Sequence, residues 1–117
     1  MFVHLEHEDK NLLLLNILSC CENTAEYARA QNASALRVAG IYSVLYEAYA
    51  LVAQMRSIPL GEWHGALCAY LVLMRDRTAG RCIELYRERK SWDLEYHEGR
   101  LEAIDVLLTY TQGVLNS

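Results

Sequence analysis

The segment Ser57-Ile58-Pro59-Leu60-Gly61 holds the only proline of the chain and lies at its midpoint. On both sides of it, apolar residues recur at helical spacing. Before the proline this spacing is filled by Val38, Ile41, Leu45, Ala48, Val52 and Met55, and after it leucines recur every seven residues at Leu94, Leu101, Leu108 and Leu115. Repeats of this kind keep one stripe of a helix turned toward a neighbouring helix, so the pattern predicts packed helices.

A central proline separates two helical halves, because proline interrupts a helix and pushes the residue before it away from helical angles. We therefore predict an all-α fold: a single-domain antiparallel four-helix bundle over residues 1–117, made of two helical hairpins joined at Pro59. The helices are expected at about 9–31, 35–56, 61–89 and 92–115, with Asn32, Ser34 and Ser91 as capping residues. Gly99 and Gly113 interrupt the last helix and are predicted sites of close helix approach.

The composition is that of an ordered, water-soluble domain, with 53 % hydrophobic and 22 % charged residues. The longest apolar run, residues 66–74, has nine residues, far fewer than the ~20 that span a bilayer. No basic segment precedes the leucines at 12–15, so a signal peptide is not expected. We expect a cytoplasmic protein that does not enter a membrane.

The charge of the chain is mildly negative, at −4, and it is unevenly distributed. Because general nucleic-acid binding relies on an excess of Lys and Arg, the balance argues against it. Residues 75–90 carry a local charge of +3 and residues 91–117 one of −4. We expect these two stretches to pair across the third and fourth helices. The alternative is a basic patch, including Arg75, Arg77 and Arg81, that holds an acidic partner or a phosphate.

Four cysteines, Cys20, Cys21, Cys68 and Cys82, are expected to be reduced, buried thiols, since two are adjacent in a helix and no secretion signal is expected. The pairs His4-x-x-His7 and His64-x-x-x-Cys68 each place two potential metal ligands on one side of a helix. Nothing in the sequence brings these pairs together with further ligands. We therefore expect no metal and no cofactor.

Tyrosines supply the strongest functional signal. The chain has eight tyrosines and one phenylalanine, and Tyr42, Tyr46 and Tyr49 form a stripe on the second helix. Tyrosine at this density suits a half-buried surface where the ring packs and the hydroxyl stays in water, as at interfaces. The alternative is ordinary packing at the boundary of the core. Together with Trp63 and Trp92, these tyrosines are the predicted contact residues.

The last helix contains Leu101-Glu102-Ala103-Ile104-Asp105-Val106-Leu107-Leu108, which places two carboxylates on one side of the helix. This stretch resembles the Glu-x-x-Asp-Val-Leu element of the all-α NTP pyrophosphatases of the MazG type. The resemblance covers about seven residues and implies magnesium binding by acids of this helix. The family also has a Glu-x-x-Glu pair on the preceding helix, but here Arg81 stands where the first of those acids would be, followed by Glu84.

The leading hypothesis is a small cytosolic interaction module, an adaptor, inhibitor or assembly factor, that binds another protein and forms a homo-oligomer, with a dimer favoured. A magnesium-dependent nucleotide pyrophosphohydrolase using Glu84, Glu98, Glu102 and Asp105 is the rival from the enzyme class. A third hypothesis is a homo-oligomer that sequesters a nucleotide or another small molecule, with tyrosines stacking on the ligand and arginines holding its phosphate.

Overall fold

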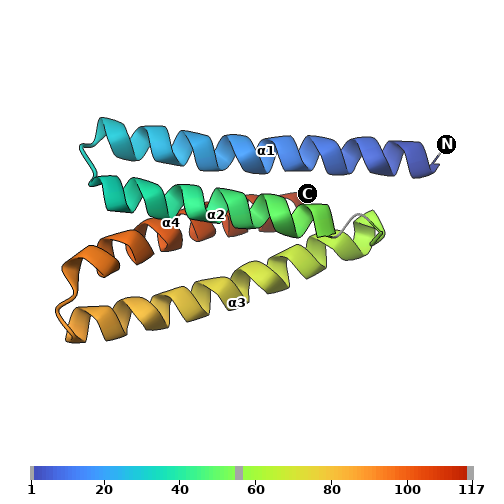
Figure 1. Cartoon of the computed structure of the whole chain (residues 1–117). Helices are drawn as coiled ribbons and strands as arrows, with labels where there is room; N and C mark the ends of the chain where they lie inside the picture. The colour runs from blue at the N-terminus through green and yellow to red at the C-terminus, as the bar shows by residue number, and fades with distance from the viewer. Residues whose placement is uncertain (1, 55–56, 116–117) are drawn as a thin grey trace.

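The structure, a computed structural model, describes residues 2–54 and 57–115, with the side chains at 2–14, 17, 52, 60, 61, 64 and 113–115 left aside. It consists of four helices packed against one another: α1 (Phe2–Ala30), α2 (Ala35–Gln54), α3 (Leu60–Arg87) and α4 (Ser91–Leu115). The described residues contain no strand (Figure 1), so the predicted all-α class is confirmed. None of the helices, over the part that is described, has the length and apolar content needed to cross a bilayer.

The helix bounds follow the predicted ones to within a few residues, with one exception. The first helix begins at Phe2, seven residues before the expected start at residue 9. The segment before Asp9 contains leucine and glutamate, which are good helix formers, and this explains the extension.

The connection between α1 and α2 is built by the two residues that the sequence predicts. Asn32 has a positive φ of 61°, and the Ala33 N–H donates to the Ala28 carbonyl at 2.9 Å, which closes a Schellman-type turn at the end of α1. The Ser34 hydroxyl then accepts a hydrogen bond from the Arg37 N–H at 3.2 Å, as an N-cap does. Both capping predictions are confirmed.

The connection between α3 and α4 has the same geometry with different residues. Arg89 adopts the positive φ, 59°, and the Lys90 N–H donates to the Leu85 carbonyl at 3.0 Å. The Lys90 carbonyl accepts the Leu94 N–H at 3.0 Å, which places Lys90 at the cap position of α4. Ser91 is therefore the first helical residue and not the cap, so that prediction is wrong by one position.

Helix α4 holds the molecule together, because it packs extensively against both α2 and α3. Helix α1 lies against α2 and, over a smaller area, against α4. The described parts of α2 and α3 do not approach each other closely. The result is an elongated molecule of 54 × 27 × 24 Å, with both short connections, 31–34 and 88–90, at the same end (Figure 1).

The predicted apolar stripes supply the core. On α2, Val38, Ile41 and Ala48 are buried, and on α4 Leu108 is buried next to the fully enclosed Ile104 and Leu107. Leu45, Leu94 and Leu101 are half-buried, while the side chains of Val52, Met55 and Leu115 lie outside the described residues. Thr111 is also fully buried, and its hydroxyl donates to the Leu107 carbonyl at 2.8 Å, which satisfies its polar group.

Two glycines allow α2 and α4 to come into backbone contact. A Cβ atom at Gly40 would overlap the Tyr96 carbonyl oxygen, and one at Gly99 would overlap the Arg37 carbonyl oxygen. The prediction of close approach at Gly99 is confirmed, whereas Gly113 lies outside the described side chains. Gly65 and Gly80 on α3 are the opposite case, since a Cβ at either position would meet nothing within 4 Å.

Ion pairs and hydrogen bonds flank these glycines. Two nitrogens of the Arg37 guanidinium donate to Glu102 Oε2 at 2.9 and 3.1 Å. In the other direction, from α4 to α2, Arg100 donates to Glu47 Oε2 at 2.9 Å and to the Ser43 hydroxyl at 2.7 Å. The Ser43 hydroxyl in turn donates to the Gly40 carbonyl at 2.6 Å. We define these groups together with Gly40 and Gly99 as the α2–α4 seam.

The seam corrects one expectation about charge. The basic and acidic stretches of α3 and α4 were expected to pair with each other, yet the described ion pairs of α4 run to α2. The close approach at Gly40 and Gly99 explains this, because it brings the carboxylates of α4 within reach of Arg37.

Candidate functional site

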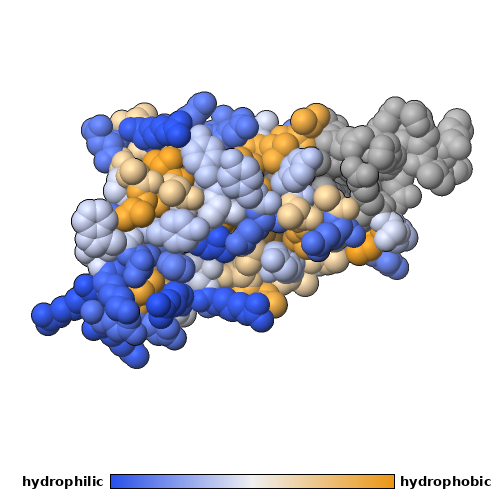
Figure 2. Space-filling view, viewed as in Figure 1, coloured by the Kyte–Doolittle hydropathy of each residue, from blue (hydrophilic) through white to orange (hydrophobic). Residues whose placement is uncertain are grey.

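A hollow of about 510 Å³ lies where α3 turns into α4. Its lining consists of Tyr86, Arg87, Arg89, Lys90, Ser91 and Leu94. Three of these six side chains are cationic and none is acidic, so the hollow is a local concentration of positive charge on a chain whose net charge is −4. Figure 2 shows strongly hydrophilic side chains gathered at the corresponding end of the molecule.

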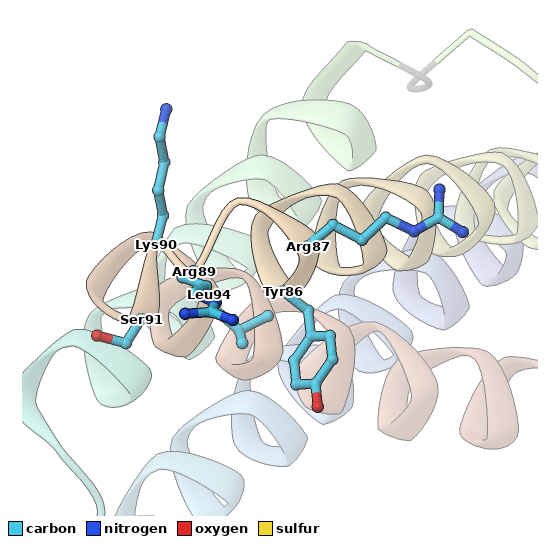
Figure 3. A pocket seen from close by; sticks show the side chains of 6 residues that line it. All are labelled: Tyr86, Arg87, Arg89, Lys90, Ser91 and Leu94. Atoms are coloured by element: carbon cyan, nitrogen blue, oxygen red, sulfur yellow. The ribbon is translucent and has the colours of Figure 1, made fainter.

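The backbone fixes how these side chains are presented. Arg89 occupies the left-handed conformation that closes the turn. Its guanidinium lies beside Leu94, and the Tyr86 ring lies on the other side of Leu94 (Figure 3). Arg87 and Lys90 extend away from this pair in different directions and form the rim. The left-handed region costs an ordinary side chain about 1 kcal/mol, so arginine is an unusual residue for this position.

Two carboxylates near the hollow form ion pairs, one of them with Lys90 of the hollow itself. Glu88 lies 3.2 Å from the Lys90 ammonium, and Glu84 lies 2.9 Å from Arg81 on the same helix. Among the residues that the structure describes, no carboxylate forms an ion pair with Arg87 or Arg89. Two guanidinium groups are therefore open to an external anion.

A second hollow, of about 460 Å³, lies at the connection between α1 and α2. It is lined by Arg29, Ala33, Ala35, Val38, Ala39 and Tyr42. The Arg29 guanidinium stands 5.3 Å from the centre of the Tyr42 ring, a cation–π arrangement worth about 0.5–1 kcal/mol at an exposed site. Most of this lining is aliphatic, so this hollow offers a ligand fewer charged groups than the one at the α3–α4 connection.

The predicted tyrosine stripe on α2 is partly anchored and partly exposed. Tyr42 is half-buried and packs against the core beneath Arg29, whereas Tyr46 is 72 % exposed and Tyr49 is 55 % exposed. We call these three residues the tyrosine surface. The rings of Tyr46 and Tyr49 are therefore accessible to another molecule without any change in the helix, while Tyr42 fixes one end of the row.

The predicted tryptophans have opposite surroundings. Trp92 lies in the first turn of α4 and is 75 % exposed. Trp63 has no exposed surface and lies in the core with Leu67 and Leu71, so it is not open to a partner in this structure. Its backbone N–H donates to the Pro59 carbonyl at 2.9 Å, which places it in the first turn of α3.

The three predicted arginines lie on α3, away from the hollow. Arg75 stands 3.6 Å from Asp76, and Arg77 is exposed. The hydrogen bond to Glu84 raises the pKa of Arg81, and the negative charges nearby add to the effect. None of the three contributes to the described lining of the hollow. The cationic groups that the fold brings together are instead Arg87, Arg89 and Lys90.

The acids of α4 serve a structural contact in this arrangement. Glu102 binds Arg37 at 2.9 Å, and Glu98 lies 3.9 Å from the same guanidinium. Among the described residues, no three His, Cys, Asp or Glu side chains come together as they do around a metal ion. His4, His7 and His64 lie outside the described side chains.

All four cysteines are free thiols, as predicted, although only Cys21 among them is fully buried. Burial raises the pKa of Cys21 to about 12, and the neighbouring Cys20 and Glu22 add to the shift. Burial also raises the pKa of the other three thiols. Because the thiolate is the reactive form, these cysteines are poor nucleophiles at neutral pH.

Comparison with known proteins leaves the family open: no family model matches the chain, and neither does a curated protein or a solved structure. Its function has to be inferred from its own side chains.

Proposed function

We propose that this protein is a small cytoplasmic interaction module that acts by binding, and that the tyrosine surface on α2 is where it contacts a second copy of the chain. In this proposal the two helical hairpins joined at Pro59 form one protomer of a homodimer. The dimer then serves as an adaptor, inhibitor or assembly factor for another protein.

The observation that carries the proposal is the exposure of Tyr46 and Tyr49 beside the anchored ring of Tyr42. Tyrosine brings a large apolar area with few rotatable bonds, and its hydroxyl keeps the free surface soluble, which is why tyrosine is enriched in interfaces. On a binding surface such rings act as anchors that supply most of the affinity.

The oligomeric state tests this directly. Light scattering on the purified full chain is expected to give twice the protomer mass of 13.4 kDa. The double variant Tyr46→Lys/Tyr49→Lys is expected to be monomeric with an unchanged helical circular dichroism spectrum, because both positions are exposed. Ile83→Lys is the matched control, since Ile83 is 55 % exposed on another helix, α3, and should leave the dimer intact. A wild-type monomer, or equal loss of mass in both variants, contradicts the proposed surface.

Contact with a further protein is tested by a photoreactive phenylalanine analogue placed at Trp92 or at Ile83 in cells that make the protein. Trp92 is a predicted contact residue outside the tyrosine surface and is 75 % exposed. Irradiation is expected to give one dominant covalent adduct with another protein from position 92, and none from position 83. Mass spectrometry of the adduct identifies the partner. If position 92 gives no adduct with another protein, the adaptor role is wrong.

A further inference from the structure

The hollow at the α3–α4 connection has the size of a small-molecule site. Its volume of about 510 Å³ lies inside the ~300–1,000 Å³ range of ligand pockets. One side chain with a flat ring, Tyr86, and one aliphatic side chain, Leu94, stand beside the cationic groups. The hollow therefore combines an apolar and aromatic wall with positive charge.

The cations in this hollow suit phosphate. Guanidinium groups bind phosphate through two parallel N–H donors, and a lysine ammonium adds a point charge. Arg87 and Arg89 have no carboxylate partner among the described residues, and Lys90 is held by a single exposed pair with Glu88. Exposed pairs of this kind contribute little, so an incoming phosphate competes with Glu88 at small cost.

The aromatic component suits a flat ring. Tyr86 is 75 % exposed, so one face of its ring is open to stacking. Stacking of a base on an aromatic side chain is favourable and accepts any base. In Figure 3 the Tyr86 ring and the Arg89 guanidinium lie on either side of Leu94, so that a single ligand can reach both.

We infer that this hollow binds a nucleotide, with its phosphates at Arg89 and the cationic rim and its base against Tyr86 and Leu94. The site is separate from the tyrosine surface, and it adds a small-molecule ligand to the protein-binding role proposed above. The chemistry requires both parts of the ligand: phosphate alone lacks the ring, and a nucleoside alone lacks the charge.

Titration calorimetry of the full chain with ADP, inorganic pyrophosphate and adenosine tests this division. ADP is expected to bind at least about tenfold more tightly than either fragment, and its affinity should fall as salt is added. Nitrogen-15 NMR spectra are expected to show ADP-induced shifts concentrated at residues 85–95. If ADP produces no binding heat at millimolar concentration, or if pyrophosphate binds as well as ADP, the inference is overturned.

Two matched glycine variants test whether the Arg89 guanidinium binds the phosphates. Arg89→Gly removes the guanidinium and keeps a residue that adopts a positive φ, and Asn32→Gly makes the same backbone change at the other connection. ADP affinity is expected to fall at least about tenfold in Arg89→Gly and to change less than twofold in Asn32→Gly. Tyr86→Leu should weaken ADP but not pyrophosphate. Unchanged ADP binding in Arg89→Gly refutes the site.

Nucleotide binding at the hollow does not depend on the proposed dimer. Tyr46→Lys/Tyr49→Lys is expected to bind ADP as the wild type does, so a failure of the tyrosine surface and a failure of this hollow are distinguished by different variants. Loss of ADP binding in that double variant, with the hollow residues intact, would place the ligand elsewhere and contradict the inference.

Discussion

Glycine and arginine occur in two opposite settings in this molecule. In the α2–α4 seam, Gly40 and Gly99 face the backbone of the other helix, and Arg100 is bound to Ser43 and Glu47. On α3 and its turn into α4, Gly80 faces open space and Arg89 has no carboxylate partner among the described residues. The same residue types are thus fixed by contacts in one region and left open in the other.

This difference separates the part of the molecule that determines the fold from the part that is open to ligands. Interior packing tolerates little added volume, so residues in the seam are constrained by their neighbours. The exposed residues of α3 and its turn, such as Gly80 and Arg89, are constrained mainly by the helix itself and are in contact with solvent. Substitutions in the seam should therefore change stability strongly, while the matching substitutions on α3 should change it weakly or in the opposite direction.

The largest effect is expected for an alanine at the point of backbone contact. Gly40→Ala or Gly99→Ala puts a methyl group onto a carbonyl oxygen of the facing helix, and no side-chain rotation can relieve the overlap. We expect each to lower the free energy of unfolding by about 3 kcal/mol, at the upper end of what overpacking costs. Urea denaturation followed by circular dichroism at one fixed protein concentration measures this.

Gly80→Ala is the matched control, because it adds the same methyl group in the interior of a helix where nothing lies within 4 Å. Its stability should rise by about 0.5–1 kcal/mol, the difference in helix propensity between the two residues. If Gly40→Ala is also stabilising, α2 and α4 are not in backbone contact, and the contrast between the two regions is wrong.

The fold was predictable in outline because its main signals are local. Spacing of apolar residues marked the helices, and Asn32 and Ser34 marked the first connection. The packing partners of the helices were not predictable from spacing. Gly40 looks like any glycine in a helix, and only the facing residues on α4 show that it is a contact point.

The candidate site was less predictable, because it depends on which charged groups find partners. From the sequence alone, Arg81 and Arg87 appear equally able to bind an anion. In the structure Glu84 pairs with Arg81, whereas no described carboxylate pairs with Arg87. No local sequence pattern indicates that Arg89 adopts a positive φ, since arginine is a poor residue for that conformation. The burial of Trp63 was not predictable for a related reason, as aromatic composition does not show which ring the core will enclose.

The second-largest change in stability is expected for the arginine contacts of the α2–α4 seam. Arg100 is 14 % exposed, and although burial alone would lower its pKa, the hydrogen bond and the charge of Glu47, together with smaller contributions from Tyr96, outweigh burial and raise it. Arg100→Met keeps most of the aliphatic stem and removes these bonds. We expect a loss of about 2 kcal/mol in unfolding free energy, since hydrogen bonds to charged groups contribute about 1.5–3 kcal/mol. Thermal unfolding followed by circular dichroism measures the change.

Arg81→Met serves as the comparison, because it removes an ion pair of the same length, 2.9 Å, from the exposed face of α3. Pairs in that setting contribute little, so its melting temperature should stay close to that of the wild type. Equal losses in the two variants would mean that burial in the seam adds nothing to the strength of an arginine contact.

The smallest effect on stability is expected at the two helix connections. There the substitution in the open region, at Arg89, is expected to change stability more than the matching substitution at Asn32. Arg89 and Asn32 both hold a positive φ, of 59° and 61°, but asparagine tolerates that conformation better than arginine does. Arg89→Gly should therefore raise the unfolding free energy by about 1 kcal/mol, and Asn32→Gly should change it by only a few tenths of that. Urea midpoints of the two variants in the absence of nucleotide measure the difference. A stabilised Arg89→Gly variant that has also lost ADP binding would show that this turn keeps an unfavourable residue for its ligand. A destabilised variant would show instead that the Arg89 side chain contributes to the fold, and the contrast between a fixed seam and an open turn would then fail at this position.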